Sequence, residues 1–427
     1  MPIYKAMTEN PKSEIRNPKS YNARAVGTDD ATLAAELERV GAQVPGQQIM
    51  WRKASFLPIR LEGLTCVGAN VLKQEMLARG GDCAVHSDCL TLDREETSVL
   101  LIGTRSQYDD LLEKLPEQAF GLPEVAQQLS DLLESLDAPL KPLQLGRHTL
   151  PIGERTLVMG ILNVTPDSFS GDSLGDDIDA AIQQARRMRI EGADILDVGG
   201  QSTRPGSDPI SVEEELHRVL PVVERLVGPD GVDLPISVDT SRAHVAEEAL
   251  KAGAHIINDI TGLRDEPEIA DVVARHNAAL VLMHIQGTPR DMQHNPHYDD
   301  LLGEVIAYLR EGVEKALSAG VPRSRIWIDP GIGFGKTLDH NLELLRRLSE
   351  MKSLGCAILV GTSRKSFIGR ILARDRGGAL PPPQERVTGT GATVAISIAN
   401  GASIVRVHDV APAVEVARIA DAIVRET

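Results

Sequence analysis

The segment LVMGILN, residues 157–163, is a short apolar run that ends in a polar residue, and a polar cluster and a helix-like stretch follow it. The same order of apolar run, polar cluster and amphipathic stretch recurs eight times between Leu157 and Val410. Eight repeats of this kind predict a (β/α)8 TIM barrel. The loops that follow the strands of such a barrel meet at one end, so we expect the polar clusters to form one site.

The apolar runs place the expected strands at residues 157–162, 195–198, 236–238, 256–257, 280–282, 326–328, 357–360 and 404–405. Parallel strands of a barrel are buried on both faces, so we expect each run to be continuously apolar. The segments between them are amphipathic. In residues 212–226, for example, Leu216, Val219 and Val223 fall on one helical face.

The composition excludes several classes of protein. Lys and Arg number 45 against 61 Asp and Glu, a net charge of -16, which argues against a nucleic-acid-binding surface or a polybasic membrane contact. The four cysteines show no paired framework, so we expect a reducing, cytoplasmic location. No run of about 18 apolar residues is present, and we therefore expect no membrane-spanning helix.

The chain is predicted to have three parts. Residues 1–25 contain Asn-Pro-Lys-Ser twice and are expected to be a disordered tail. Residues 26–137 mix helical and strand-like patterns and are expected to form a small α/β domain of unknown role. Pro139 and Pro142 mark a linker, and residues 138–427 are expected to form the barrel domain.

An acidic and amide set follows three of the expected strands. Asp239, Asn258 and Asp329 each come directly after an aliphatic run. Carboxylates in this position accept paired hydrogen bonds from a heterocycle with adjacent N–H donors, and an amide both donates and accepts. The alternative for any one of them is a structural Asp that caps the next helix. Three such residues at the same end of the barrel, which we call its mouth, favour a binding site.

A basic set comes from other loops of the same mouth. Arg204, Lys365, Arg406 and His408 follow the second, seventh and eighth strands. Barrels commonly bind phosphate at loops seven and eight, where the N-terminus of a helix favours an anion. The cluster around Lys365 would elsewhere be a solvated charge cluster, but its position just after a buried strand favours a site.

The loop DPGIGFGK, residues 329–336, is rich in glycine. Its glycines indicate a sharp turn or a close approach of the backbone to a ligand, and their spacing does not match a dinucleotide-binding fingerprint. Phe334 is one of five phenylalanines in the chain. It either stacks on a planar substrate or closes the loop as a hydrophobic plug.

These segments together resemble the dihydropteroate synthase family, from about Pro142 to the C-terminus. The resemblance rests on several motifs in the family's order: GILNVTPDSFS at 160–170, GGQSTRPG at 199–206, SVDT at 237–240, IND at 257–259, LMH at 282–284, DPGIGFGK at 329–336, SRKSFIG at 363–369 and RVHDV at 406–410. The resemblance does not extend to the first 140 residues.

The resemblance implies a transferase of folate biosynthesis that condenses 6-hydroxymethyl-7,8-dihydropterin diphosphate with 4-aminobenzoate and releases diphosphate. It implies catalytic roles for Asp239, Lys365 and Arg406. It also implies three sets of binding residues: a pterin pocket of Asp239, Asn258, Met283, Asp329 and Lys365; a diphosphate site of Asn163, Thr203, Arg204, Arg406 and His408; and an aminobenzoate site of Thr203, Pro205, Phe334, Lys365 and Ser366.

The resemblance further implies Mg2+ bound between Asn163 and the phosphate oxygens, and a homodimer that packs through the late helices of the barrel. Two alternatives remain at this point. A methyltransferase that passes a methyl group from a folate to a corrinoid protein uses a related barrel, but it has no diphosphate to hold. A non-catalytic pterin-binding module would need no phosphate set either, so Arg204, Lys365 and His408 favour the synthase.

Overall fold

The computed structural model describes residues 24–27, 30–164, 174–201 and 208–425. The chain divides into two compact units, Met1–Ser130 and Asp131–Thr427. The division falls inside α5 (Leu122–Asp137), and that helix ends where the two-proline linker was expected. The tail predicted for residues 1–25 lies almost wholly outside the described residues, and the predicted domain boundaries stay a prediction.

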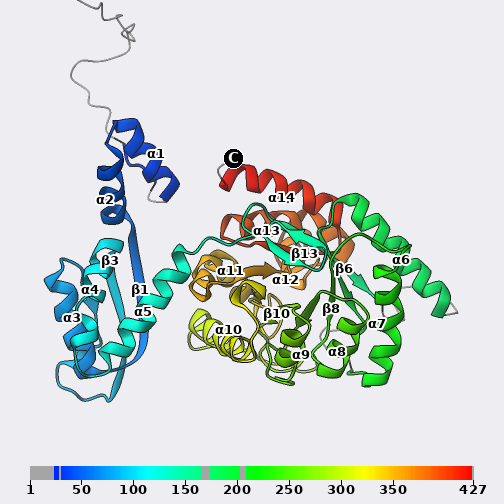
Figure 1. Ribbon diagram of the computed structural model, residues 1–427, viewed down its shortest axis with the longest axis horizontal. Helices are drawn as coiled ribbons and strands as arrows, with labels where there is room; N and C mark the ends of the chain where they lie inside the picture. The colour runs from blue at the N-terminus through cyan, green and yellow to red at the C-terminus, as the bar shows by residue number, and fades with distance from the viewer. Residues whose placement is uncertain (1–23, 28–29, 165–173, 202–207, 426–427) are drawn as a thin grey trace, which may run out of the picture. The chain divides into compact units, whose positions relative to one another are not determined.

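The first unit is the small α/β domain that the sequence predicts (Figure 1). Its sheet has the order β1-β3-β2, and both strand pairs are antiparallel. Alternate residues of β3 are buried, from Thr97 to Gly103, so one face of the sheet packs against the unit's core. Its elements are α1 (Asp30–Val40), α2 (Val44–Ala54), β1 (Phe56–Thr65), α3 (Cys66–Ala78), β2 (Asp82–Ala84), η1 (Ser87–Cys89), β3 (Glu96–Thr104), α4 (Arg105–Leu112) and η2 (Leu115–Glu117).

The second unit confirms the predicted TIM barrel. Eight parallel strands close in the order β10-β11-β12-β13-β6-β7-β8-β9. Each expected strand is present, and most extend beyond the apolar run by one or two residues toward the polar cluster. The strands are β6 (Leu157–Asn163), β7 (Ile195–Gly199), β8 (Ile236–Asp239), β9 (Ile256–Asp259), β10 (Ala279–Met283), β11 (Ile326–Asp329), β12 (Ala357–Val360) and β13 (Ile404–Val407).

Helices surround these strands in the ribbon view (Figure 1). They begin at residues typical of helix starts: Ser211 accepts a hydrogen bond from the N–H of Glu214, and Thr337 accepts one from the N–H of His340. The helices are α6 (Leu174–Glu191), α7 (Val212–Val227), α8 (Ala243–Lys251), α9 (Ile269–Arg275), α10 (Leu301–Ser318), α11 (Leu338–Arg346), α12 (Ser366–Ala373), α13 (Val387–Ala399) and α14 (Val410–Val424), with 3-10 turns η3 (Arg323–Arg325), η4 (Leu348–Leu354), η5 (Arg374–Arg376) and η6 (Pro383–Arg386).

The hydrophobic core of this unit has two parts. The larger part lies between the strands and the surrounding helices. The smaller part fills the inside of the barrel around Trp327, and the hairpin of β4 (Leu143–Leu145) and β5 (His148–Leu150) packs against it. Among the described residues, no helix combines the length and the apolar character needed to cross a membrane.

The expectation of continuously apolar strands is wrong at two positions. Asp197 in β7 and Ser237 in β8 are fully buried, and they pair in register across the two strands. A buried carboxylate is tolerated only where hydrogen bonds or a counter-charge compensate for the water it loses. These two residues therefore indicate that a polar network begins inside the barrel, below the loops.

Candidate active site

One line of register brings three of the predicted residues together. Asn163 pairs with Gly199, Gly199 with Asp239, and Asp239 with Asn258, across the four neighbouring strands β6 to β9. Gly199 leaves space between its neighbours: a Cβ built there would lie 3.7 Å from the Cβ of Asp239 and 3.8 Å from Oδ1 of Asn163. The side chains of Asn163 and Asp239 thus flank a position without a side chain.

Arg406 joins this line from the other side of β6. It lies in β13, where its Nε donates to Oδ2 of Asp197 at 2.6 Å and its Nη2 donates to Oδ2 of Asp239 at 2.8 Å. Asn258 donates through Nδ2 to the same Oδ2 of Asp197 at 3.1 Å, and the hydroxyl of Ser237 donates to Oδ1 at 2.6 Å. Arg406 is therefore held by two carboxylates inside the barrel.

Asp197 belongs to this network, although the pattern of strand-end clusters does not single it out. Its signal is a carboxylate within the apolar run of residues 195–198, where a parallel strand normally carries none. The side chain accepts hydrogen bonds from three residues of the network, which makes it the common partner of Arg406 and Asn258.

The environment of Asp239 changes its acidity. Burial raises the pKa of this carboxyl to about 7, with the charges of Asp197 and Glu215 acting in the same direction and Arg406 opposing them. The pKa of Arg406 is raised by Asp197 and Asp239, although its burial acts the other way. The guanidinium thus stays charged while Asp239 titrates near neutrality.

A second pair of strands supplies the other half of the site. Met283 at the end of β10 pairs in register with Asp329 at the end of β11, and both are buried. Oδ1 of Asp329 accepts a hydrogen bond from the N–H of Gly331 at 2.7 Å. Burial raises the pKa of Asp329, and the nearby charge of Lys365 opposes that shift.

Lys365 precedes the first residue of α12 and reaches toward the glycine-rich loop. Its ammonium donates to the carbonyl of Ile332, and its Nζ lies 4.6 Å from the centre of the Phe334 ring, a cation–π distance. Burial lowers the pKa of Lys365 to about 8, with Arg406 acting in the same direction and Asp329 and Asp239 opposing. Phe334 also packs against the apolar cluster that contains Met283, as expected of a hydrophobic plug, and its stacking on a planar substrate stays a prediction.

The glycine-rich loop is fixed by its backbone and by one buried lysine. Gly331 has φ +66°, and a Cβ there would lie 1.9 Å from the carbonyl oxygen of His284, so only glycine fits. Lys336 is 2% exposed, and its Nζ is 2.9 Å from the carbonyl oxygen of Phe334 and 2.8 Å from Nδ1 of His284. These contacts hold the loop against β10.

Some of the loop residues after β12 and β13 make contacts within the protein, and others are exposed. Arg364 has φ +57°, and its guanidinium forms an ion pair with Asp409, so this side chain has a structural partner. Nδ1 of His408 lies 3.0 Å from Oγ of Ser363. Ser366 is exposed at the start of α12. The basic cluster is therefore not a uniform solvated surface.

Not every polar residue at a strand end belongs to the site. Asp259, next to Asn258, accepts hydrogen bonds from the backbone of Thr261 and Leu263 at 2.8 and 2.7 Å, so it stabilises the loop after β9. Thr203, Arg204 and Pro205, predicted for the diphosphate and aminobenzoate sites, lie outside the described residues.

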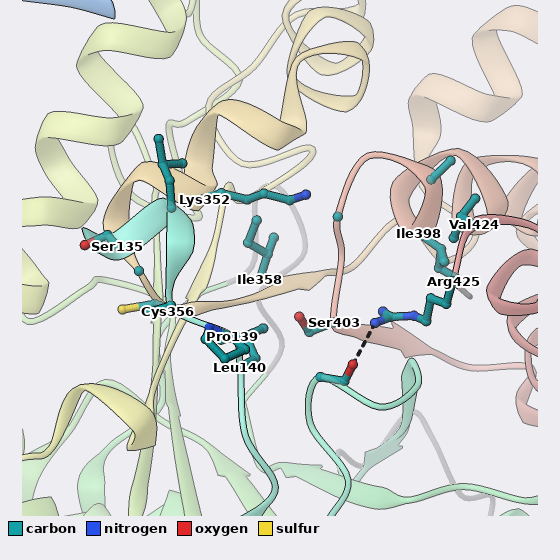
Figure 2. Close-up of a pocket in the computed structure, with 16 residues that line it drawn as sticks. Ser135, Pro139, Leu140, Lys352, Cys356, Ile358, Ile398, Ser403, Val424 and Arg425 are labelled. Carbon is teal, nitrogen blue, oxygen red and sulfur yellow. Dashed lines mark hydrogen bonds between the residues drawn. The ribbon is translucent and has the colours of Figure 1, made fainter. Parts of the chain in front are cut away.

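A cavity of about 390 Å³ lies at the opposite end of the barrel. Figure 2 shows Ile358 at the start of β12, Ser403 before β13, and the side chains of Lys352 and Arg425 around it. Arg425 donates to the carbonyl of Gly153 at 3.2 Å. None of the predicted site residues lines this cavity, which distinguishes it from the mouth where the carboxyl ends of the strands meet.

Comparisons with known proteins identify the family of the chain. Residues 159–408 match the family described as pterin binding enzyme. The dihydropteroate synthase of Synechocystis is 50% identical over 268 residues, which are 63% of this chain and 90% of that protein. A solved structure of the Xanthomonas albilineans dihydropteroate synthase with 4-aminobenzoic acid is 43% identical with a TM-score of 0.59, and it covers 66% of this chain and 96% of that one.

A longer relative also includes most of the N-terminal unit in its match. The probable bifunctional folylpolyglutamate synthase/dihydropteroate synthase of Halobacterium salinarum is 44% identical over 394 residues. These are 92% of this chain and 46% of that protein. The chain belongs to the dihydropteroate synthase family of pterin-binding enzymes, transferases of folate biosynthesis that condense 6-hydroxymethyl-7,8-dihydropterin diphosphate with 4-aminobenzoate and release diphosphate.

Proposed function

We propose that the mouth of the barrel is one active site in which Asp239, Lys365 and Arg406 carry the chemistry of this reaction. The observation that supports the assignment is the buried chain of hydrogen bonds from Asn258 through Asp197 and Arg406 to Asp239. Titratable groups with shifted pKa values and specific charged partners concentrate at functional sites.

The pterin ring binds in a pocket of Asp239, Asn258, Met283, Asp329 and Lys365. A pterin offers adjacent N–H donors on one edge, and two carboxylates and an amide oxygen are suited to accept from them. Met283 supplies an adaptable apolar contact beside the ring. The supporting geometry is two pairs in register at the ends of neighbouring strands, Asp239 with Asn258 on β8 and β9, and Met283 with Asp329 on β10 and β11.

The diphosphate group binds to Asn163, Thr203, Arg204, Arg406 and His408. Arg406 has a double role in this proposal. Its two ion pairs orient the carboxylate of Asp239, and a guanidinium, with about five N–H donors, has donors left for an anion. His408 lies beside Ser363, with its Nδ1 3.0 Å from Oγ of Ser363, and its imidazole is the group that meets the phosphate oxygens in this proposal.

A magnesium ion fits the donor chemistry at Asn163. The side chain lies at the end of β6, and among the described residues its amide makes no hydrogen bond. Mg2+ is typically held in proteins by one or two oxygen ligands together with water and substrate phosphate oxygens, and an amide oxygen at a strand end suits that set. When bound, the ion supplies positive charge that stabilises the departing diphosphate.

The 4-aminobenzoate binds near Thr203, Pro205, Phe334, Lys365 and Ser366. The ring of Phe334 lies beside Nζ of Lys365, so an aromatic face and a cation are presented together. A flat aromatic acid can use both, because the ring packs on the apolar face while the cation or the Ser366 hydroxyl binds the carboxylate. The Xanthomonas albilineans relative has been solved with this acid.

The protein supplies electrostatic stabilisation rather than a strong base. An arylamine is uncharged at neutral pH and is already a nucleophile, so the demanding step is the departure of diphosphate from the pterin methylene. Arg406, Arg204 and His408 stabilise the negative charge that develops on the leaving group. The carboxylate of Asp239 stabilises positive character on the pterin as the C–O bond breaks.

We also propose that the enzyme forms a homodimer through α13 and α14. These two helices pack side by side, and both expose large aliphatic side chains: Ile396 on α13 and Ile419 and Ile423 on α14 are 51%, 66% and 77% exposed. Exposed aliphatic residues gathered on neighbouring helices favour an interface between copies of the chain.

The test of the residue assignment is an assay of the purified chain with the pterin diphosphate and 4-aminobenzoate, which measures dihydropteroate and released diphosphate. We expect both products from the wild type and a large loss in Lys365→Ala, while Lys352→Ala, at the other end of the barrel, retains activity. The same pair of variants should separate in complementation of a folate-requiring host. A Lys365→Ala enzyme with unchanged kcat/KM for both substrates would overturn the assignment.

A further inference from the structure

We propose that Cys66 and Cys89 of the N-terminal unit form an oxidisable dithiol that closes to a reversible intramolecular disulfide. The thiol of Cys66 donates to Sγ of Cys89, and the two sulfur atoms are 3.1 Å apart. Both cysteines are buried, with 2% and 0% of the residue exposed. The bonded distance is about 2.05 Å, so the sulfur atoms need to approach by about 1 Å.

The backbone around the two cysteines holds them in this relation. Cys66 is the first residue of α3, whose start is capped by the side chain of Thr65. One turn later on the same helix, Asn70 donates through Nδ2 to the carbonyl of Cys89 at 2.7 Å. The helix thus contacts Cys89 at its sulfur and at its backbone, which fixes η1 against the N-terminal turn of α3.

The environment allows a reagent to reach the pair although the sulfurs are buried. The residue after Cys89, Leu90, is 80% exposed, and Leu92 is 57% exposed. The chain that leaves η1 therefore lies at the surface, and a small local opening there uncovers Cys89. The pKa of Cys66 is raised above its ordinary value, because its thiol donates to Cys89 and because it is buried, so reaction is expected to quicken as the pH rises.

The reaction is thiol–disulfide exchange with a low-molecular-weight disulfide such as oxidised glutathione. The thiolate of one cysteine attacks the reagent and forms a mixed disulfide, which releases one reagent thiol. The second cysteine then attacks the protein sulfur and releases the second reagent thiol. Two S–H bonds of the protein are lost and one S–S bond forms; the reagent's S–S bond breaks, and its two thiols take the protons and electrons.

The other two cysteines provide matched controls. Cys83 is buried in the same unit, but its sulfur lies 4.0 Å from a carbonyl oxygen of Ala84 rather than near a thiol. Cys356 is buried in the barrel, where its thiol contacts the carbonyl of Leu354 at 3.5 Å. All four cysteines are buried, but only Cys66 and Cys89 are in contact with a second sulfur atom.

The experiment treats the full-length, fully reduced chain with oxidised glutathione under native conditions, blocks the remaining thiols with iodoacetamide, and maps disulfides by non-reducing digestion and mass spectrometry. We expect a Cys66–Cys89 cross-linked peptide pair, its reversal by dithiothreitol, and a midpoint of thermal unfolding for the N-terminal unit that is several degrees higher in the oxidised chain, because a cross-link over 23 positions restricts the unfolded chain. Cys83→Ser and Cys356→Ser should keep the cross-link, and Cys66→Ser or Cys89→Ser should abolish it.

The wild-type chain alone can overturn the proposal, without reliance on variants that fail to fold. Persistent glutathione adducts on one cysteine without closure, pairing that involves Cys83 to the same extent, or a cross-link that forms only in denaturant would each contradict it.

Discussion

Asp197 and Arg406 lie 209 positions apart in the chain, yet Oδ2 of Asp197 accepts a hydrogen bond from Nε of Arg406 at 2.6 Å. Asp197 is in β7 and Arg406 is in β13, and β6 separates these strands in the barrel sheet. The ion pair therefore spans a strand on the inside of the barrel. It orients the guanidinium toward Asp239, which accepts its second hydrogen bond.

Asp197→Asn should reduce kcat/KM for the pterin diphosphate by about 100-fold, since misplacing a site group by about 1 Å can cost that much. The amide keeps the size of the side chain but removes the charge that aligns Arg406. The control is Asp194→Asn, which alters another ion-paired aspartate, bound to Arg155 outside the site. Steady-state kinetics and thermal unfolding of both variants distinguish a loss of Arg406 alignment from a loss of protein stability. Equal kinetic losses in the two variants would contradict a specific role for Asp197.

The pH profile should report Asp239. Burial raises its pKa to about 7, so the carboxyl is largely protonated below that pH and ionised above it. Because the ionised form accepts the pterin's hydrogen bonds and stabilises positive charge, kcat/KM for the pterin diphosphate should rise from pH 6 to pH 8. Asp239→Asn should lower kcat/KM and remove this rise. A profile of the same shape in the variant would assign the ionisation to another group.

The raised pKa of Asp239 also has a consequence for stability. A folded-state pKa above the unfolded value favours the folded state at low pH, and this contribution is lost as the pH rises from about 4 to about 7. Asp239→Asn cannot ionise, so the difference in unfolding free energy between variant and wild type should shift in favour of the variant over that range. Urea unfolding of both chains at several pH values measures the shift. A constant difference would show that the carboxyl does not titrate in this range.

Lys365 should determine the alkaline side of the activity profile. Burial lowers its pKa to about 8, so the ammonium begins to lose its proton just above neutral pH. We expect kcat/KM to fall above pH 8 in the wild type. Lys365→Arg keeps the charge, so its activity should be lower but free of that alkaline loss. An unchanged alkaline limb in Lys365→Arg would exclude Lys365 as its source.

Gly331→Ala should destabilise the protein by about 3 kcal/mol, because overpacking adds to the cost of a left-handed backbone. The added Cβ would lie 1.9 Å from the carbonyl oxygen of His284. Gly320→Ala is the matched control: it also has a positive φ, +95°, but no atom lies within 4 Å of the added Cβ. We expect a loss of about 1 kcal/mol there. Equal losses in chemical denaturation would show that the backbone conformation, not the clash, decides the cost.

Charge placed on α14 should separate the proposed dimer. Ile419→Lys and Ile423→Lys introduce an ammonium group at exposed positions of this helix, and burying it in an interface without a partner is costly. Light scattering should show dimers for the wild type and monomers for these variants. Ile190→Lys on α6, where the isoleucine is 87% exposed, should remain dimeric. A monomeric wild-type chain would contradict the proposed interface.

The barrel and most of its strand-end residues could be predicted because they depend on short-range pattern. A buried parallel strand needs an apolar run, and the polar residue that follows it marks the mouth, so Asp239, Asn258 and Asp329 were identified by position alone. The terminal boundaries of the strands were less predictable. Hydrogen bonding between strands continues into the polar residues, which extends β9 from the expected residues 256–257 to Ile256–Asp259.

Asp197 shows where pattern fails. The local sequence does not show whether a carboxylate inside an apolar run has a functional role. Its partners Arg406 and Asn258 are distant in sequence. The pairing of Cys66 with Cys89 is of the same kind, because spacing alone gave no thiol pair.

The sequence by itself determined the fold class and the chemical types gathered at the mouth, because strand and helix periods and the ends of apolar runs are local properties. Only the tertiary structure decided which of those groups neutralise one another. Closure of the barrel places β13 beside β6, and this brings Arg406 within reach of Asp197 and Asp239. The pKa values of Asp239 and Lys365 follow from that burial and those neighbours, which no local pattern specifies.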